Sequence, residues 1–263
     1  MQESRVLKKL REGKPVLCTK TNFNDPGIVE QIGLIGFDCI WLCQEHLWSN
    51  KETLANMILA ARATNMDVMV RIEKNGYPSI FPILEMGAKG IMVPHVISPE
   101  EAKEWIKAAK FHPLGRRGID GVNADADWGL ADFQDYLKFS NEQTFLAFEI
   151  EDKEAIDSLE EIASLPGFEI LFVGIGDLSQ SMGFPGEIKH PKIIKVLEKV
   201  AKIARKYHKF ASAPGISPEW TKKLLKMGYL FITGGADIIF LKDCFSKLRQ
   251  DYEKIGFSFG RQK

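Results

Sequence analysis

Eight short apolar runs alternate with helix-like stretches along almost the whole chain, and this rhythm restricts the fold more than any other feature. The runs are VLCTKT (16–21), FDCIWLC (37–43), DVMVRI (67–72), GIMVPHV (90–96), TFLAFEI (144–150), EILFVGIG (169–176), KFASAPG (209–215) and LFITGGAD (230–237). Near-continuous apolar strands separated by helices indicate parallel pairing with right-handed crossovers. The pattern therefore predicts an α/β fold, with residues 1–263 forming a single (β/α)8 TIM barrel domain.

Two features bear on this interpretation. A doubly wound open sheet would carry a GxGxxG turn, whereas GIGDLS (174–179) lacks that spacing and lies late in the chain. The stretch 112–143, rich in Gly, Asp and Asn, is longer than an ordinary connection. Such a stretch is either functional, an oligomer contact or a mobile surface excursion.

The composition excludes several classes of function. Lys+Arg and Asp+Glu both total 35 in 263 residues, so the net charge is zero and no long-range field favours nucleic acid or an anionic membrane. The four cysteines show no CxxC spacing, which is typical of a reduced, cytoplasmic protein. The N-terminal stretch has no apolar core of a signal peptide, and no run is long enough to cross a bilayer. We therefore expect a small-molecule substrate and neither a nucleic-acid nor a membrane partner.

Acidic residues follow two neighbouring strands of the predicted barrel. Glu151 comes directly after the run 144–150, and Asp177 comes directly after the run 169–176. The carboxyl ends of all barrel strands face one mouth, so the two carboxylates are expected to lie side by side. Hard oxygen ligands of this kind suit Mg²⁺ or Mn²⁺. The alternative is that each acid only caps the helix that follows.

Arg71 is the most informative single residue. A guanidinium at the end of a buried strand must be paired or must bind an anion, and Arg71 could grip a carboxylate with two hydrogen bonds. The alternative is a structural ion pair with Glu45, Glu73 or Glu151.

Two histidines follow strands. Histidine is the side chain best suited to exchange protons near neutral pH, so His46 is a candidate general base, although an isolated loop histidine is often only a satisfied polar residue. We interpret His95, in the turn after the fourth strand, as structural.

Six segments, in order, point to a known family. They are CQEH (43–46), VR (70–71), ILEMGAKGIMVP (83–94), EIE (149–151), GIGDLS (174–179) and APGI (213–216). Together they resemble the motifs DGEH, VR, LLDxGxxxxLVP, QIET, GPADLS and APGI of the HpcH/HpaI family of metal-dependent (class II) pyruvate aldolases, which includes 4-hydroxy-2-oxoheptanedioate aldolase.

The resemblance implies an assembly and a cofactor. It implies a barrel of the phosphoenolpyruvate/pyruvate type that forms a homohexamer, as a trimer of dimers, with the last helix exchanged between neighbours. It also implies a divalent metal, Mg²⁺, Mn²⁺ or Co²⁺, held by Glu151 and Asp177 and chelated by pyruvate.

The resemblance further implies roles for individual residues. Arg71 corresponds to the arginine that contacts the ketone oxygen of pyruvate. His46 corresponds to the histidine of proton transfer, and Glu85 to an acid that raises the basicity of that histidine. The backbone around Gly176 and Asp177 corresponds to the turn that holds the pyruvate carboxylate.

The chain departs from the family pattern near the expected metal. Cys43 and Gln44 replace the family's Asp-Gly, and Ile175 and Gly176 replace its Pro-Ala. Glu149, which we include among the substrate-binding residues, replaces a glutamine and adds negative charge beside the metal.

The sequence thus predicts a carbon–carbon lyase that cleaves a 4-hydroxy-2-oxo acid reversibly into pyruvate and an aldehyde. Abstraction of a methyl proton from pyruvate creates an enolate, whose oxygen requires positive groups such as the metal and Arg71. The base is either His46 or a metal-bound hydroxide. Two alternatives remain: related enolate chemistry, such as oxaloacetate decarboxylation or use of a substituted pyruvate, and a non-catalytic barrel retained for binding or assembly. The sequence does not identify the aldehyde.

Overall fold

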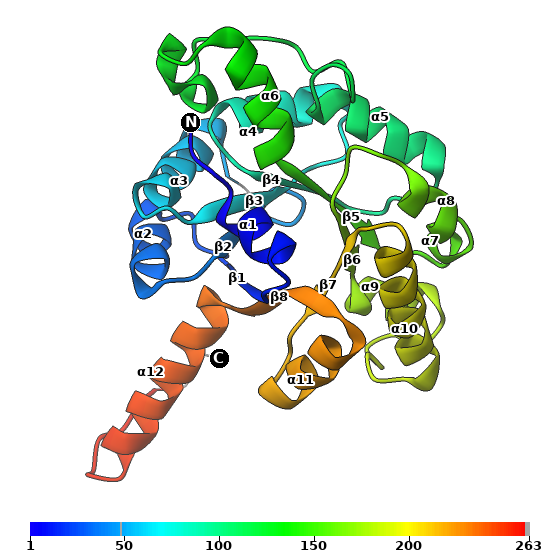
Figure 1. The fold of residues 1–263 in the computed structure, drawn as a ribbon. Helices are drawn as coiled ribbons and strands as arrows, with labels where there is room; N and C mark the ends of the chain where they lie inside the picture. Colours follow the sequence, from blue (N-terminus) through cyan, green and yellow to red (C-terminus); the bar gives the residue numbers. More distant parts are fainter. Residues whose placement is uncertain (48, 261–263) are drawn as a thin grey trace.

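The structure, a computed structural model that describes residues 1–47 and 49–260, is a closed barrel of eight parallel strands (Figure 1). The strands are β1 (Val16–Lys20), β2 (Cys39–Cys43), β3 (Asp67–Arg71), β4 (Gly90–Val93), β5 (Phe145–Ile150), β6 (Ile170–Val173), β7 (Phe210–Pro214) and β8 (Tyr229–Ala236). Each strand pairs with the next in the chain, and β8 pairs with β1. The predicted (β/α)8 barrel is confirmed.

Helices follow the strands around the outside of the barrel. They are α2 (Pro26–Ile35), α3 (Lys51–Ala63), α4 (Phe81–Glu85), α5 (Pro99–Ala109), α6 (Phe133–Gln143), α7 (Lys153–Asp157), α8 (Leu159–Ser164), α9 (Ile175–Ser181), α10 (Pro191–Lys206), α11 (Pro218–Met227) and α12 (Asp237–Glu253). The sequence punctuates several of them. Asn50 and Ser217 cap α3 and α11 with side-chain hydrogen bonds, and Gly228 ends α11 in the left-handed region, at a φ of 101°.

One further helix, α1 (Arg5–Arg11), closes the N-terminal end of the barrel, and in Figure 1 it lies across the barrel's centre. Its buried leucines, Leu7 and Leu10, pack with side chains inside the barrel, including Phe145 and Phe231. Ser4 caps the helix and donates a 2.6 Å hydrogen bond to the Asp67 carboxylate. Because α1 blocks this end, a small molecule can enter the barrel only through the mouth at the C-terminal ends of the strands.

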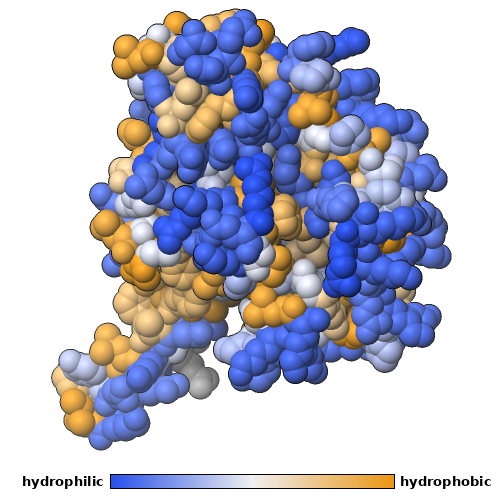
Figure 2. All heavy atoms as spheres, viewed as in Figure 1, coloured by the Kyte–Doolittle hydropathy of each residue, from blue (hydrophilic) through white to orange (hydrophobic). Residues whose placement is uncertain are grey.

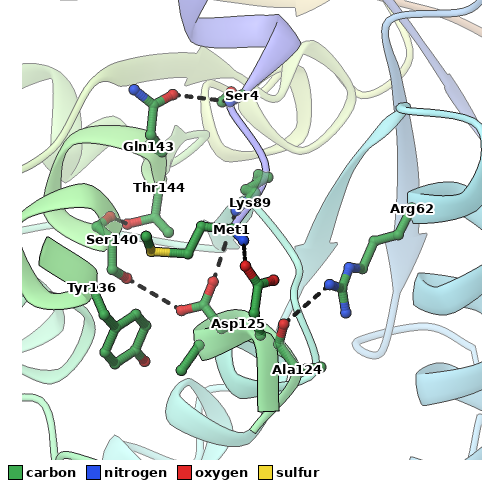
Figure 3. A network of polar contacts seen from close by, with 12 residues as sticks. Met1, Ser4, Arg62, Lys89, Ala124, Asp125, Tyr136, Ser140, Gln143 and Thr144 are labelled. Atoms are coloured by element: carbon green, nitrogen blue, oxygen red, sulfur yellow. Dashed lines mark hydrogen bonds and ion pairs between the residues drawn. The ribbon is translucent and has the colours of Figure 1, made fainter. Parts of the chain in front are cut away.

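The long stretch 112–143 contains a 3-10 helix (Ala124–Gly129) and α6, and part of it is anchored beneath the barrel. Figure 3 shows Asp125 of this stretch between Lys89 and Ser140, with its carboxylate 3.7 Å from the Lys89 ammonium. Arg117, also buried, lies 3.4 Å from the same carboxylate. Trp128 and Leu130, by contrast, are exposed. The stretch therefore belongs to the N-terminal end of the barrel, and its apolar tip remains free of contacts with the chain's own core.

Helix α12 does not pack along the barrel but projects from it (Figure 1). Only Asp237, its first residue, is buried. Its exposed apolar side chains include Ile239, Phe240, Phe245 and Leu248, and Figure 2 shows apolar surface along this arm. An apolar helix left in water is typical of an element that requires a partner. Within the described residues, no helix has the length and apolar character needed to span a membrane.

The seal formed by α1 gives the first prediction. Leu7 is fully buried, so Leu7→Ala removes apolar contacts at the base of the barrel and should lower the free energy of unfolding by about 3 kcal/mol. Denaturant unfolding measures this change. The control is Lys8→Ala on the same helix, whose side chain is 65% exposed and which should change stability by less than about 0.5 kcal/mol. Equal effects of the two variants would contradict the assigned packing of α1.

Candidate active site

Arg71 lies at the centre of the barrel mouth, at the end of β3, and is only 5% exposed. Its Nε lies 3.0 Å from Glu45 Oε2, and its Nη1 lies 3.4 Å from Glu149 Oε2. Burial opposes the charge of Arg71, but Glu149, Cys43 and Glu45 outweigh it and raise the pKa of the guanidinium above its ordinary value. Arg71 is therefore a permanent cation held between two strands.

Two neighbours on β2 fix the plane of this guanidinium. The Cys43 sulfur lies 3.4 Å from Arg71 Nε and 3.2 Å from Nη2 and accepts hydrogen bonds from both. The Trp41 ring lies against the guanidinium, 4.9 Å from its central carbon. Both side chains face the barrel interior because alternate residues of a strand point to the same side. The arginine is thus oriented before any ligand arrives.

Glu149, on β5, is a deeply buried carboxyl of the mouth, at 1% exposure. Burial is the largest influence on its pKa and raises it well above the ordinary range, with Glu151 and Glu45 adding to the increase and Arg71 opposing it. Burial thus favours the protonated form of Glu149, and the charge of Arg71 favours the ionised form.

Glu151 follows β5 and is equally buried. Its Oε1 accepts a 2.9 Å hydrogen bond from the backbone N–H of His95. Its Oε2 lies over Gly174, where an added Cβ would stand 2.3 Å away, so only glycine fits beneath this carboxylate. Burial raises the pKa of Glu151 to about 7, the His95 contacts lower it, and the charge of Asp177 raises it further. Asp177 is thus one of several charged groups that act on Glu151, and the role of Glu151 and Asp177 as a metal-binding pair remains a prediction.

Asp177 and Gly176 lie in the first turn of α9 and are exposed to the mouth. Nothing lies within 4 Å of the position that a Cβ would take on Gly176, so the space above this turn is open. The turn is held from below, because the Ser179 hydroxyl donates a 2.6 Å hydrogen bond to the Gly176 carbonyl and accepts a 3.0 Å bond from Gly186 N. The predicted position for a substrate carboxylate is thus accessible.

His95 contacts the acidic residues of the mouth, so the interpretation of it as merely structural is incomplete. Its Nδ1 lies 2.9 Å from Asp152 Oδ2 and 3.5 Å from Glu151 Oε1, and its Nε2 lies 3.8 Å from Glu45 Oε1. Burial lowers the pKa of His95, but the hydrogen bond that its ring makes to the Asp152 carboxylate and the surrounding negative charges raise it overall. The available signal was its position two residues after β4, beside β5, the strand that contains Glu149 and that Glu151 follows.

His46 lies at the rim of the mouth, with 61% of its side chain exposed. Its Nε2 is 3.7 Å from Glu45 Oε2, and its backbone N–H points to the Cys43 sulfur at 3.5 Å. Glu45 thus lies between His46 and Arg71 and contacts both. His46 therefore lies at the edge of the acidic mouth and contacts it through Glu45.

Glu85 lies apart from the residues at the mouth. It ends α4, and burial and the charges of Arg117, Asp120 and Asp125 are what act on its pKa, with a net increase. These groups belong to the stretch 112–143, which meets the N-terminal end of the barrel. The structure brings neither His46 nor Arg71 to Glu85, so its role in proton transfer remains a prediction without a supporting contact.

The donor set fits a hard divalent cation. Among the residues that the structure describes, no group of three or more His, Cys, Asp and Glu side chains is arranged to hold a metal. The Glu151 and Asp177 carboxylates supply two oxygen donors, which is the usual protein contribution when water and substrate complete the shell of Mg²⁺. A carboxyl that burial and a neighbouring acid push to a pKa of about 7 would regain its charge beside such a cation.

Comparison with known proteins identifies the class of this barrel. Residues 21–242 match the family model described as HpcH/HpaI aldolase/citrate lyase, and the chain belongs to this family. The family description and the curated relatives name aldolases and a citrate lyase, which are carbon–carbon lyases, so the sequence-based assignment to a family of aldol lyases is confirmed.

Individual relatives support this placement. The 4-hydroxy-2-oxo-heptane-1,7-dioate aldolase of Escherichia coli is 29% identical over 236 residues, which are 88% of each chain. The 2-keto-3-deoxy-L-rhamnonate aldolase of Escherichia coli strain K12 is 25% identical over 91% of this chain and 89% of its own. Among solved structures, citrate synthase SbnG superposes with a TM-score of 0.87 at 26% identity, covering 95% of this chain and 98% of its own. An HpcH/HpaI aldolase from Desulfitobacterium hafniense DCB-2 gives 0.88 at 25% identity, covering 97% and 98%.

The raised pKa of Glu151 predicts a pH dependence of stability in protein kept in chelator. The native state binds this proton more tightly than the unfolded chain, whose carboxyl keeps the ordinary pKa of 4.5, so stability falls as the pH rises from 4.5 to about 7. Glu151→Gln removes this loss. Between pH 4.5 and 8 the free energy of unfolding of the variant should gain about 3 kcal/mol relative to the wild type.

Denaturant unfolding at several pH values measures this difference. The exposed Glu198→Gln on α10 is the control and should follow the wild-type profile. A constant offset between Glu151→Gln and the wild type at all pH values would contradict the assigned pKa.

Proposed function

We propose that this protein cleaves a 4-hydroxy-2-oxo acid reversibly into pyruvate and an aldehyde at the C-terminal mouth of the barrel. One observation carries the proposal: the buried, oriented Arg71 contacts Glu149 and acts electrostatically on Glu151, which Asp177 after the neighbouring strand also influences. This arrangement suits chemistry in which negative charge develops on a ketone oxygen. The names of the two Escherichia coli aldolases support the same reaction type.

The proposed metal is Mg²⁺, Mn²⁺ or Co²⁺, and Glu151 and Asp177 would hold it. When bound, the cation supplies positive charge that favours ionisation of the substrate next to its carbonyl group. The accessible turn at Gly176 and Asp177 would receive the pyruvate carboxylate, because its outer side is open. Glu149 would line the same position, where the charge of Glu151 raises its pKa and the charge of Arg71 lowers it.

Arg71 supplies the second positive group. Glu45 and Glu149 hold it on two sides, and the Cys43 sulfur and the Trp41 ring fix its plane. A donor oriented in this way stabilises a developing oxyanion without reorganisation, an effect worth about 3 to 4 kcal/mol in the transition state.

His46 is the proposed proton-transfer residue. It stands at the rim, where it can meet the methyl group of a pyruvate whose carboxylate lies against α9, and Glu45 is the acid that orients its ring. We therefore assign to Glu45 the supporting role that the family resemblance gave to Glu85. His95 contacts Glu151 and Asp152 and positions the carboxylate of Glu151 through its backbone N–H.

Exchange of the methyl protons of pyruvate in D₂O tests the enolate step without requiring the natural aldehyde. The wild type should exchange these protons when a divalent cation is present and should stop in chelator. Arg71→Lys keeps the charge but loses the planar fork, and Arg71→Ala loses both, so exchange should fall by a factor of about 10² to 10³ in the alanine variant. NMR of the methyl signal measures the rate.

The matched control is Arg205→Ala on α10, which should exchange at the wild-type rate. Glu151→Gln should no longer respond to added cation. Exchange that continues in chelator and in Arg71→Ala would contradict the proposed chemistry. An aldehyde panel with pyruvate, compared with release of CO₂ from oxaloacetate, then separates aldol cleavage from decarboxylation.

We further propose that residues 1–263 form one cytoplasmic domain that assembles as a homo-oligomer, a hexamer by family resemblance, with α12 packed on a neighbouring copy. The free cysteines support a reducing compartment. The exposed apolar face of α12 supports exchange of this helix, since it finds no cover within its own chain.

Light scattering tests the role of α12. The wild type should have a mass several times that of one chain. Phe245→Glu or Leu248→Glu should shift the protein toward smaller species, because each substitution puts a charge into an apolar contact. Lys247→Glu on the same helix changes charge without removing an apolar side chain and should keep the wild-type mass. Retention of the full mass by both apolar variants would contradict the exchange.

A further inference from the structure

One buried carboxylate at the mouth has no part in the proposed chemistry. Asp237 is the first residue of α12, directly after β8, and is only 6% exposed. A buried carboxylate is unfavourable unless hydrogen bonds or cations compensate its charge. The contacts of Asp237 therefore show what it does in the fold.

Asp237 joins two separate segments of the mouth. Its Oδ1 accepts 2.7 Å hydrogen bonds from the backbone N–H groups of Asn22 and Ile238. Its Oδ2 accepts a 3.1 Å hydrogen bond from Phe23 N and contacts the Thr21 hydroxyl. Ile238 belongs to the first turn of α12, whereas the other three residues begin the connection between β1 and α2. One carboxylate therefore holds this connection against the start of the projecting helix.

A cavity of about 960 Å³ opens between the two segments. Asn22 lines the wall that follows β1. The wall formed by α12 consists of Ile238, Ile239 and Phe240. The distance across the cavity thus depends on the hydrogen bonds of Asp237.

The cavity adjoins the reacting centre. Trp41 lines it, and the Trp41 ring lies 4.9 Å from the guanidinium carbon of Arg71. A reactant in the cavity is therefore a neighbour of a pyruvate held at Arg71.

The two walls are supported differently. Gly235, near the end of β8, has a φ of 69°, and an added Cβ there would stand 2.1 Å from the Phe240 ring. The first turn of α12 thus packs directly on the backbone of β8. The opposite wall depends on Asp237, which is the recorded acceptor for the N–H groups of Asn22 and Phe23. Loss of this carboxylate would release the wall that follows β1.

The two steps of the proposed reaction make different demands on the mouth. Removal of a methyl proton requires only pyruvate, the base and the positive groups around the enolate oxygen. Carbon–carbon bond formation requires in addition that the aldehyde be held within reach of the enolate, and an error of about 1 Å in its position can cost a factor of about 10² in rate. A shift of the cavity walls should therefore affect the second step and leave the first intact.

We propose that Asp237 is a positioning residue for the aldehyde. By holding the connection after β1 against α12, it sets the space in which the aldehyde meets the enolate. The inference deepens the proposed aldol function and rests on it. Asp237 acts through the backbone of Asn22 and Phe23 and through the first turn of α12, and it touches neither reactant.

Comparison of the two steps tests the proposal. Asp237→Asn keeps the size of the side chain but turns one acceptor oxygen into a donor, so at least one backbone N–H loses its partner. In aldol addition of pyruvate to the aldehyde that the wild type uses best in the panel, the KM for the aldehyde should rise about tenfold. Methyl-proton exchange of pyruvate alone should keep the wild-type rate and the wild-type KM for pyruvate.

Thr21 offers a milder change that does not depend on the folding of the first variant. Thr21→Val has a similar shape but lacks the hydroxyl, and it should raise the KM for the aldehyde by a smaller factor. Thr21→Ser keeps the hydroxyl and should behave as the wild type. Asp157→Asn, at the exposed end of α7, is the control and should change neither step.

Amide hydrogen exchange, followed by mass spectrometry, measures the release of the connection after β1 without turnover. Peptides that contain Asn22 and Phe23 should exchange faster in Asp237→Asn than in the wild type. Peptides from α10 should exchange at the wild-type rate in the same sample, which shows that the barrel remains folded.

Three results would overturn the inference. The first is an equal loss of aldol addition and methyl-proton exchange in Asp237→Asn and Thr21→Val, which indicates a purely structural role. The second is an unchanged KM for the aldehyde in Asp237→Asn, whether or not the amides exchange faster. The third is a wild type that exchanges the methyl protons but adds pyruvate to no aldehyde of the panel. Failure of the wild type to exchange these protons at all would instead contradict the proposed function, and the inference with it.

Discussion

The structure depends on an imbalance of charge at the mouth of the barrel. Glu149 and Glu151 are almost fully buried, Glu45 and Asp177 act on them, and Arg71 is the guanidinium that faces these acids. Burial of several carboxylates near one cation is unfavourable unless protons or a second cation balance them. The raised pKa values of both buried glutamates express this condition. Protonation of the buried glutamates therefore stabilises the empty site, and a bound cation would favour their ionised forms, which can act as ligands.

The packing of the barrel fixes the positions of these charged side chains. Inside the barrel, side chains of alternate residues form apolar layers, and α1 seals the lower end with Leu7 and Leu10. Cys43 pairs in register with Arg71, which brings the β2 sulfur against the guanidinium. Water therefore reaches the charged groups only from the mouth, and the same packing that stabilises the protein also limits access to the reacting centre.

The fold was predictable from the sequence because barrel strands are buried on both faces and read as continuous apolar runs. Arg71 and Glu151 were predictable for a related reason, since a charged residue at the end of such a run is conspicuous. Contacts made through tertiary packing were not. His95 enters the cluster through a left-handed turn, with a φ of 52°, which an isolated VPH segment does not indicate. Glu85 ends a short helix, α4, whose orientation is set by the stretch beneath the barrel, and no local pattern records that orientation.

The departures from the family motifs acquire a physical meaning in the structure. The family pattern has an aspartate where this chain has Cys43, and a glutamine where it has Glu149. Both positions contact Arg71: the sulfur at 3.2 Å and the Glu149 carboxylate at 3.4 Å. Together the two changes remove an acid that would face Arg71 from β2 and place one that faces it from β5. The charge of Arg71 remains compensated, but the acid on β5 is now a neighbour of Glu151. Burial and the charge of Glu151 raise the pKa of Glu149, and a cation bound there would offset this repulsion. The replacements at Cys43 and Glu149 therefore compensate each other. Cys43→Asp alone would add a further carboxylate to a site in which acids already outnumber the single arginine.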